Sequence, residues 1–199
     1  MVVRPSRHDW RCRTSSRFDA TSGQSMKWGR STRYDLRRAA KRHWPTATGL
    51  GLAVAGLLAV MVVRTEDATP RPDGIELAGA VLWRGVVYGA TDGLLLSVFP
   101  ILVVFAAFAG TRLRARLTGT LLIGVIALVA SLAMTATYHA GYGDFRSAKM
   151  AKPLQGDVAW SMPTLLTLNP IGAPIAHVGL HVSAVLHSYE TDTFLPPHE

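Results

Sequence analysis

The chain has 199 residues, of which 49% are hydrophobic and only 17% charged, and its formal net charge is +8. The apolar residues are concentrated in runs, and residues 47–63 and 117–137 contain no Asp, Glu, Lys or Arg. Such runs argue against a soluble globular enzyme and, because the positive charge lies outside them, against a wholly disordered basic protein. We therefore predict an all-α polytopic membrane protein, a small bundle of about four transmembrane helices.

Residues 1–45 carry twelve Lys and Arg among Ser, Thr and Gly, and we predict a largely disordered basic cytoplasmic tail. Its charges suit the anionic lipids of an inner leaflet. A nucleic-acid partner is not expected, because the basic cluster adjoins a span and lacks a known reading motif. Met26 is a candidate alternative start of translation, because the residues after it already form a basic segment that leads into the first span. Residues 1–25 could therefore lie upstream of the true start codon.

Four apolar segments follow the tail. We expect spans over residues 46–63, 85–108 and 117–138 and a weaker one within 161–186, which together make a transmembrane domain of residues 46–187. Loops are expected over residues 65–74 and 140–158, and residues 75–83 either extend the second helix or lie along the surface. A short acidic tail over residues 188–199 could dock on the basic loop 112–116 or on a partner.

The basic residues predict the orientation of the four spans. Fifteen Lys and Arg lie before the first span or between the second and third, against six in the segments on the other side. By the positive-inside rule both termini are cytoplasmic in a multi-pass plasma-membrane protein. Only four of the 21 basic residues are lysines, and together with abundant Ala and Gly this bias points to a GC-rich bacterial genome.

Small residues recur along one face of each of the first three spans. Because helices in lipid associate through close approach of small side chains, these stripes indicate helix packing rather than chemistry. The stripes are Ala47, Gly51, Ala55 and Ala59; Gly85, Gly89, Gly93 and Ser97; and Thr120, Gly124, Ala127, Ser131 and Thr135.

Asp92 is the one acidic residue within a predicted span. An ionisable group at membrane depth usually faces the bundle interior or a water-filled cavity. Tyr88 lies one turn away on the same face. The functional interpretation of Asp92 is a metal ligand, a proton carrier or a general base, and the alternative is a carboxylate that hydrogen-bonds a neighbouring helix.

Two histidine-containing segments accompany this aspartate. Thr135 and His139 share a face at the end of the third span, where Asp144 and neighbouring tyrosines could fold back over the bundle mouth or form an interfacial cluster. His177 and His181 are four residues apart, so both imidazoles lie on one helical face. The alternative to metal binding is a pair of hydrogen-bonded structural histidines.

Pro170 and Pro174 interrupt the fourth segment, just after Asn169. If one helix ran unbroken from Met162, His177 would lie too deep to meet His139. If a new helix begins near Ile171, His177 comes level with Asp92. A metal site therefore requires the break.

We predict that four of these residues form an intramembrane metal centre, with zinc as the expected metal: Asp92, His139, His177 and His181. The supporting polar residues are Tyr88, Thr135, Asp144 and Asn169. The set resembles the CREST superfamily of membrane hydrolases, which includes alkaline ceramidases and adiponectin-type receptors, where a His, an Asp, a Ser and a late His-x-x-x-His surround zinc. That family has seven spans, and its Ser-x-x-x-His corresponds here to Thr135-Ala-Thr-Tyr-His139.

The leading functional hypothesis is a metal-dependent intramembrane hydrolase that acts on a lipid or lipid-linked substrate. The competing hypothesis is a non-enzymatic membrane component, either an accessory subunit or a small proton-coupled transporter in which Asp92 and the histidines relay protons. A homo-oligomer or a larger membrane complex is expected in that second case, because four spans are few for a transporter.

Overall fold

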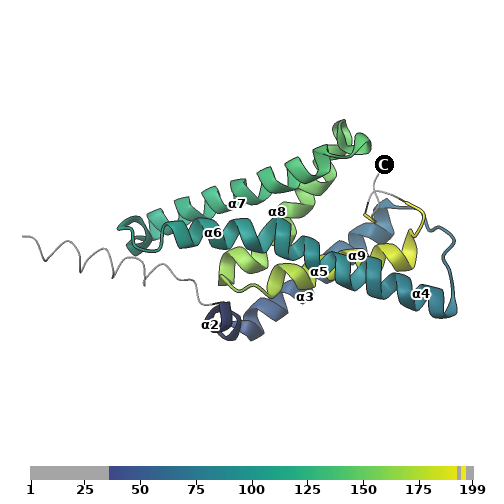
Figure 1. Cartoon of the computed structure of the whole chain (residues 1–199), viewed down its shortest axis with the longest axis horizontal. Coiled ribbons are helices and arrows are strands. Elements are labelled where there is room, and N and C mark those ends of the chain that lie inside the picture. Colours follow the sequence, from purple (N-terminus) through teal and green to yellow (C-terminus); the bar gives the residue numbers. More distant parts are fainter. Residues whose placement is uncertain (1–35, 192–193, 196–199) are drawn as a thin grey trace, which may run out of the picture.

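The structure is a computed structural model that describes residues 36–191 and 194–195, and its regular elements are helices (Figure 1). Most of the basic tail predicted over residues 1–45 lies outside the described residues. A short helix, α2 (Leu36–Lys41), leads into the bundle. The bundle consists of α3 (Trp44–Thr65), a continuous helical segment Gly74–Ala107, α7 (Leu117–Ala140), α8 (Ala151–Thr167) and α9 (Gly172–His187).

Three of these helices are long and apolar enough to cross a membrane: α3, the segment Gly74–Ala107 and α7. They correspond to the first three predicted spans and indicate a multi-pass membrane protein. Their outward surfaces carry the large apolar side chains expected against lipid, and Leu52, Leu121 and Val125 are each at least 60% exposed.

The second of these helices is longer than predicted, because residues 75–83 extend it. It consists in order of α4 (Gly74–Ala80), a π-helical stretch Val81–Val87, α5 (Tyr88–Asp92), a second π-helical stretch Gly93–Val98, and α6 (Phe99–Ala107). The second π-helical stretch ends just before Pro100, whose ring nitrogen has no hydrogen to donate.

The segment predicted to contain a weaker fourth span, residues 161–186, includes the end of α8 and most of α9. α8 ends at Thr167, Leu168 takes a left-handed φ of 53°, and α9 begins at Gly172. The proline at position 170 cannot continue the hydrogen-bonding of α8, so the chain turns back there. At 17 and 16 residues, α8 and α9 are shorter than the three long helices. The predicted helix break near Ile171 is confirmed.

The two ends of the bundle are marked by contacts between distant segments. Asn169 Nδ2 donates to the carbonyl oxygens of Ala39, Ala40 and Arg42 at 2.7–3.1 Å, which holds the α8–α9 turn beside α2. His187 Nε2 lies 3.0 Å from the Glu66 carbonyl oxygen, so α9 and α3 finish together. We call these the Asn169 end and the Glu66 end.

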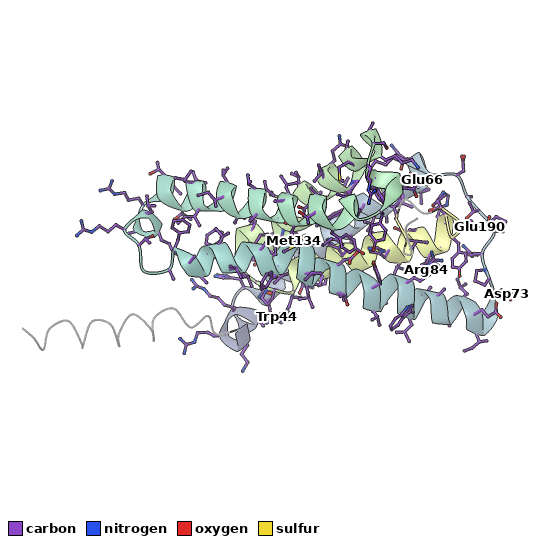
Figure 2. All side chains as sticks on the ribbon, turned by 45° about the horizontal axis from the view of Figure 1, so that its top comes forward. Trp44, Glu66, Asp73, Arg84, Met134 and Glu190 are labelled. Atoms are coloured by element: carbon purple, nitrogen blue, oxygen red, sulfur yellow. The ribbon has the colours of Figure 1, made fainter. Side chains whose placement is uncertain are left out.

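The described chain therefore starts at the Asn169 end and finishes at the Glu66 end (Figure 1). That both termini lie on the cytoplasmic side stays a prediction. Residues 161–186, within which the fourth span was predicted, belong to the hairpin of α8 and α9, which runs along the bundle and back. Figure 2 shows Glu66 and Glu190 near one end and Trp44 toward the other.

α9 is the central helix, enclosed by α3 on one side and the long helix Gly74–Ala107 on the other. Close approach depends on small residues. A Cβ on Gly93 would lie 2.6 Å from Pro174 Cα, and one on Gly89 would lie 3.0 Å from Val178 Cα. The predicted glycine stripe thus packs against α9. Gly124, predicted for the α7 stripe, has no neighbour within 4 Å of such a Cβ, and the buried stripe instead runs through Ala127, Ser131, Thr135 and His139.

Candidate metal centre

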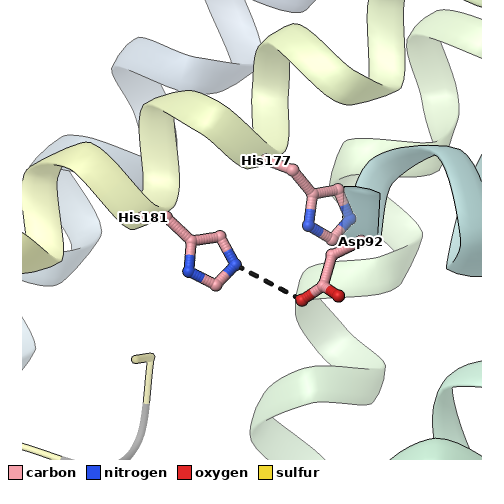
Figure 3. A group of neighbouring side chains, drawn as sticks. All are labelled: Asp92, His177 and His181. Atoms are coloured by element: carbon pink, nitrogen blue, oxygen red, sulfur yellow. Dashed lines mark ion pairs between the residues drawn. The ribbon is translucent and has the colours of Figure 1, made fainter. Parts of the chain in front are cut away.

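Asp92, His177 and His181 meet inside the bundle (Figure 3). Asp92 comes from α5 and both histidines come from α9. One potential ligand atom from each residue lies within 4.8 Å of the other two, and the residues are only 8%, 2% and 5% exposed. The structure thus places three of the four predicted ligands in one buried group that could hold a metal ion.

Local helical geometry sets up this group. His177 and His181 lie one turn apart on α9 with nearly parallel rings, whose centroids are 6.2 Å apart. The close approach of Gly89 and Gly93 to α9 brings the Asp92 carboxylate to the histidine face. Asp92 itself ends the short α5, between the two π-helical stretches, a distortion that often occurs at functional sites.

The polar atoms of the group are poorly satisfied by protein neighbours. His181 Nε2 lies 3.5 Å from Asp92 Oδ2. Among the described residues, both ring nitrogens of His177 and Nδ1 of His181 are buried and have no hydrogen-bond partner. A buried polar atom left unpaired costs about 1–3 kcal/mol. A ligand that accepts electron pairs from these nitrogens would remove that cost.

The donor set suits a borderline divalent metal. Two imidazoles and one carboxylate are the protein ligands of several catalytic zinc sites, which keep a fourth position for water. The same donor types also bind non-haem iron. The set therefore fits zinc, as predicted, and leaves the identity of the metal open.

A cavity of about 30 Å³ adjoins the three residues, enough space for a water-sized ligand. Lys152 is half-exposed and marks the place where the cavity meets the surface at the Glu66 end. Its Nζ forms an ion pair of 3.1 Å with Glu66 Oε1. The cavity is lined by Met61, Asp92, Leu96, His139, Lys152, Pro153, Gly156, Trp160, His177, Leu180, His181 and Phe194.

His139, the fourth predicted ligand, lines the same cavity from α7 but does not belong to the group of three. Its Nδ1 lies 2.8 Å from the Thr135 carbonyl oxygen, one turn back along the helix. This hydrogen bond orients the ring, as is usual for metal-binding histidines. The ring also packs edge-on against Phe145, with centroids 4.8 Å apart.

Two of the predicted supporting residues contact histidines that line the cavity, Tyr88 contacting His181 and Thr135 contacting His139. The Tyr88 ring packs against His181 with centroids 5.7 Å apart, and its hydroxyl is hydrogen-bonded to that of Tyr138. Thr135 is fully buried, and its side-chain oxygen has no hydrogen-bond partner among the described residues.

The other two lie away from it. Asp144 forms an exposed ion pair with Lys149 at 3.4 Å. Asn169 is buried at the opposite end of the bundle, where it joins the α8–α9 turn to α2. Neither lines the cavity.

A second buried acid, Asp157, was missed by the sequence analysis. It lies on α8 and is fully buried. Its Oδ1 accepts hydrogen bonds from Ser161 Oγ at 2.8 Å and Trp160 Nε1 at 2.9 Å, with Ser131 Oγ 3.0 Å away. Trp160 in turn packs on His177, with ring centroids 4.3 Å apart. Asp157 thus contacts the metal group indirectly, through Trp160. Because α8 begins at Ala151, the prediction of a loop over residues 140–158 is wrong beyond residue 150.

The sequence of α8 has helical periodicity, but many of the residues that repeat with this period are polar. The buried positions 153, 156, 157, 160, 161 and 164 follow helical spacing. Because several of them are Asp, Ser and Thr, a search for apolar periodicity did not detect the helix.

Comparison with known proteins finds no match: no family model fits the sequence, and neither a curated protein nor a solved structure is significantly similar to the chain.

Proposed function

We propose that this chain is a metal-dependent hydrolase of the plasma membrane that cleaves a lipid or lipid-linked substrate. The observation that carries the proposal is the buried Asp92, His177 and His181 group, in which three ring nitrogens have no protein partner among the described residues. Polar groups at this depth are costly and usually functional. A divalent metal would be held by one nitrogen of each ring together with the Asp92 carboxylate, and it would activate a bound water for attack on a carbonyl or phosphoryl centre.

Each residue has a distinct part in this proposal. Asp92 and His181 supply a carboxylate oxygen and an imidazole nitrogen that already lie 3.5 Å apart. His177 supplies the deepest nitrogen, and Trp160 holds its ring in place. His139, oriented by the Thr135 carbonyl, supplies a further nitrogen from across the cavity. This set includes every histidine named in the resemblance to the CREST superfamily.

The substrate class follows from the location of the site. The cavity lies within a bundle of apolar helices, so a substrate reaches it most readily from the bilayer. Its wall combines apolar side chains such as Leu96 and Leu180 with a single lysine, Lys152, at the surface. This lining suits an acyl chain attached to a polar headgroup. The basic N-terminal residues, proposed to contact anionic inner-leaflet lipids, would keep the protein in lipid-rich membrane.

The metal content of detergent-purified protein tests the first step. Plasma mass spectrometry should find about one zinc per chain in the wild type, as expected for a three- or four-ligand site. The double variant His177→Ala/His181→Ala should lose it at an unchanged size-exclusion profile. His187→Ala is the matched control, because this histidine is on the same helix but contacts the Glu66 carbonyl outside the group.

Release of fatty acid from a panel of amide- and ester-linked lipids tests the second step. Fatty-acid release that is lost on addition of a metal chelator and restored by zinc would support the proposed hydrolase. Wild-type protein with no bound metal would overturn the proposal and favour the proton-relaying membrane component.

A further inference from the structure

After α9 the chain turns back over the Glu66 end of the bundle. The Thr69 amide donates to the His187 carbonyl oxygen, and the Glu190 amide donates to Thr69 Oγ1, each at 3.0 Å. The Arg84 guanidinium lies 4.8 Å from the centroid of the Tyr189 ring. These contacts fasten the described residues 188–191 to the loop between α3 and α4, at the end of the bundle opposite the basic loop 112–116.

Phe194 and Leu195 then enter the bundle. Leu195 is fully buried in the core cluster that includes Leu58, Val62 and Trp160. Phe194 lines the cavity that contains the metal group, and Lys152 Nζ lies 5.9 Å from the centroid of its ring. Phe194 thus lies beside Lys152 on the wall of the cavity, and Leu195 occupies the adjoining apolar cluster.

We propose that Phe194 and Leu195 occupy the subsite for the apolar chain of the substrate, close the cavity in the resting protein, and leave when a lipid chain enters. This proposal rests on the proposed function for the identity of the substrate. Leu195 packs in a cluster of apolar residues that shares Trp160 and Leu180 with the lining of the cavity. An acyl chain placed there would hold its polar linkage near His177.

The apolar nature of these contacts explains how the segment can leave. Burial of one leucine side chain favours the closed state by a factor of roughly ten or more. An acyl chain buries comparable apolar area in the same place, so it competes with the segment at a similar free energy. The segment therefore acts as an internal competitor of the substrate.

Cysteine reactivity tests the closure without reference to activity. In a Cys12→Ser background, Met61→Cys places a thiol on the cavity wall, and a negatively charged methanethiosulfonate reagent reports access to it in detergent. The double change Phe194→Ala/Leu195→Ala should accelerate labelling roughly tenfold or more, since it removes most of the apolar burial. Leu195→Met, which keeps the bulk, should label as slowly as the parent.

Lys149→Cys, at a position where the side chain is 61% exposed, should react at the same rate with and without the double change, which controls for unfolding. Equal labelling of Met61→Cys in both backgrounds would overturn the closure. In the double variant, oleate should slow the labelling again by filling the vacated subsite, and no protection by oleate would overturn the subsite assignment.

The result is separable from the metal hypothesis. Faster labelling in a protein without bound zinc would retain the closure and reject the hydrolase. Unchanged labelling in a protein that holds zinc would reject the closure and retain the metal site.

Discussion

The indole of Trp160 connects His177 of the candidate metal group to the second buried acid, Asp157, because it packs against His177 at 4.3 Å between ring centroids and donates its N–H to Asp157. One side chain thus positions a candidate metal ligand and satisfies a carboxylate that lies behind it. Such supporting contacts commonly change metal affinity by about 10–100-fold when they are removed.

Trp160→Leu should therefore weaken zinc binding by about tenfold or more. The loss arises because His177 becomes free to rotate. Competition with a chromophoric zinc chelator in detergent measures the affinity. Trp83→Leu is the control, since Trp83 is 67% exposed and lies outside the cavity. Equal affinities for the two variants would show that the indole does not position the ligand.

Asp157→Ala should destabilise the protein strongly. The change leaves the buried Trp160 N–H unpaired and removes the shared acceptor of Ser131 and Ser161, and an unpaired buried group costs about 1–3 kcal/mol. Asp144→Ala should cost less than about 1 kcal/mol, because its ion pair with Lys149 is exposed. Thermal unfolding in the same detergent compares the two. A similar small loss for both would contradict the role assigned to the buried cluster.

Gly93→Ala should both destabilise the bundle and reduce zinc content. The added Cβ would lie 2.6 Å from Pro174 Cα and 2.8 Å from its nitrogen. Because these are backbone atoms, the helices must separate, typically at about 1–3 kcal/mol, and Asp92 moves away from α9. Gly124→Ala meets nothing within 4 Å and should leave both properties unchanged. Normal zinc content in Gly93→Ala would show that this contact does not set the ligand geometry.

Zinc binding should weaken as the pH is lowered from about 8 to about 5. An imidazole must be neutral to bind a metal, so protons compete with zinc for histidine ligands. Equilibrium dialysis at several pH values measures the affinity. An affinity independent of pH would indicate that His177 and His181 are not the ligands.

Local sequence patterns were sufficient for part of the fold and of the site. The three long apolar helices, the placement of His177 and His181 on one helical face, and the break before them depend on hydrophobic run length, the 3.6-residue period and the chemistry of proline. Asp92 stood out because it is an acid within an apolar run. These properties belong to short stretches of chain and do not need knowledge of distant partners.

Other features depend on contacts between distant segments. The polar face of α8 is buried against α7, where Ser131 donates a hydrogen bond to Asp157. No apolar pattern in the sequence predicts this helix. The hairpin of α8 and α9, the opposite positions of the two ends of the described chain, and the entry of Leu195 into the core also required the tertiary structure. The physical reason is that a buried polar side chain is favourable only when its hydrogen-bond partners are present, and those partners lie far away in the sequence.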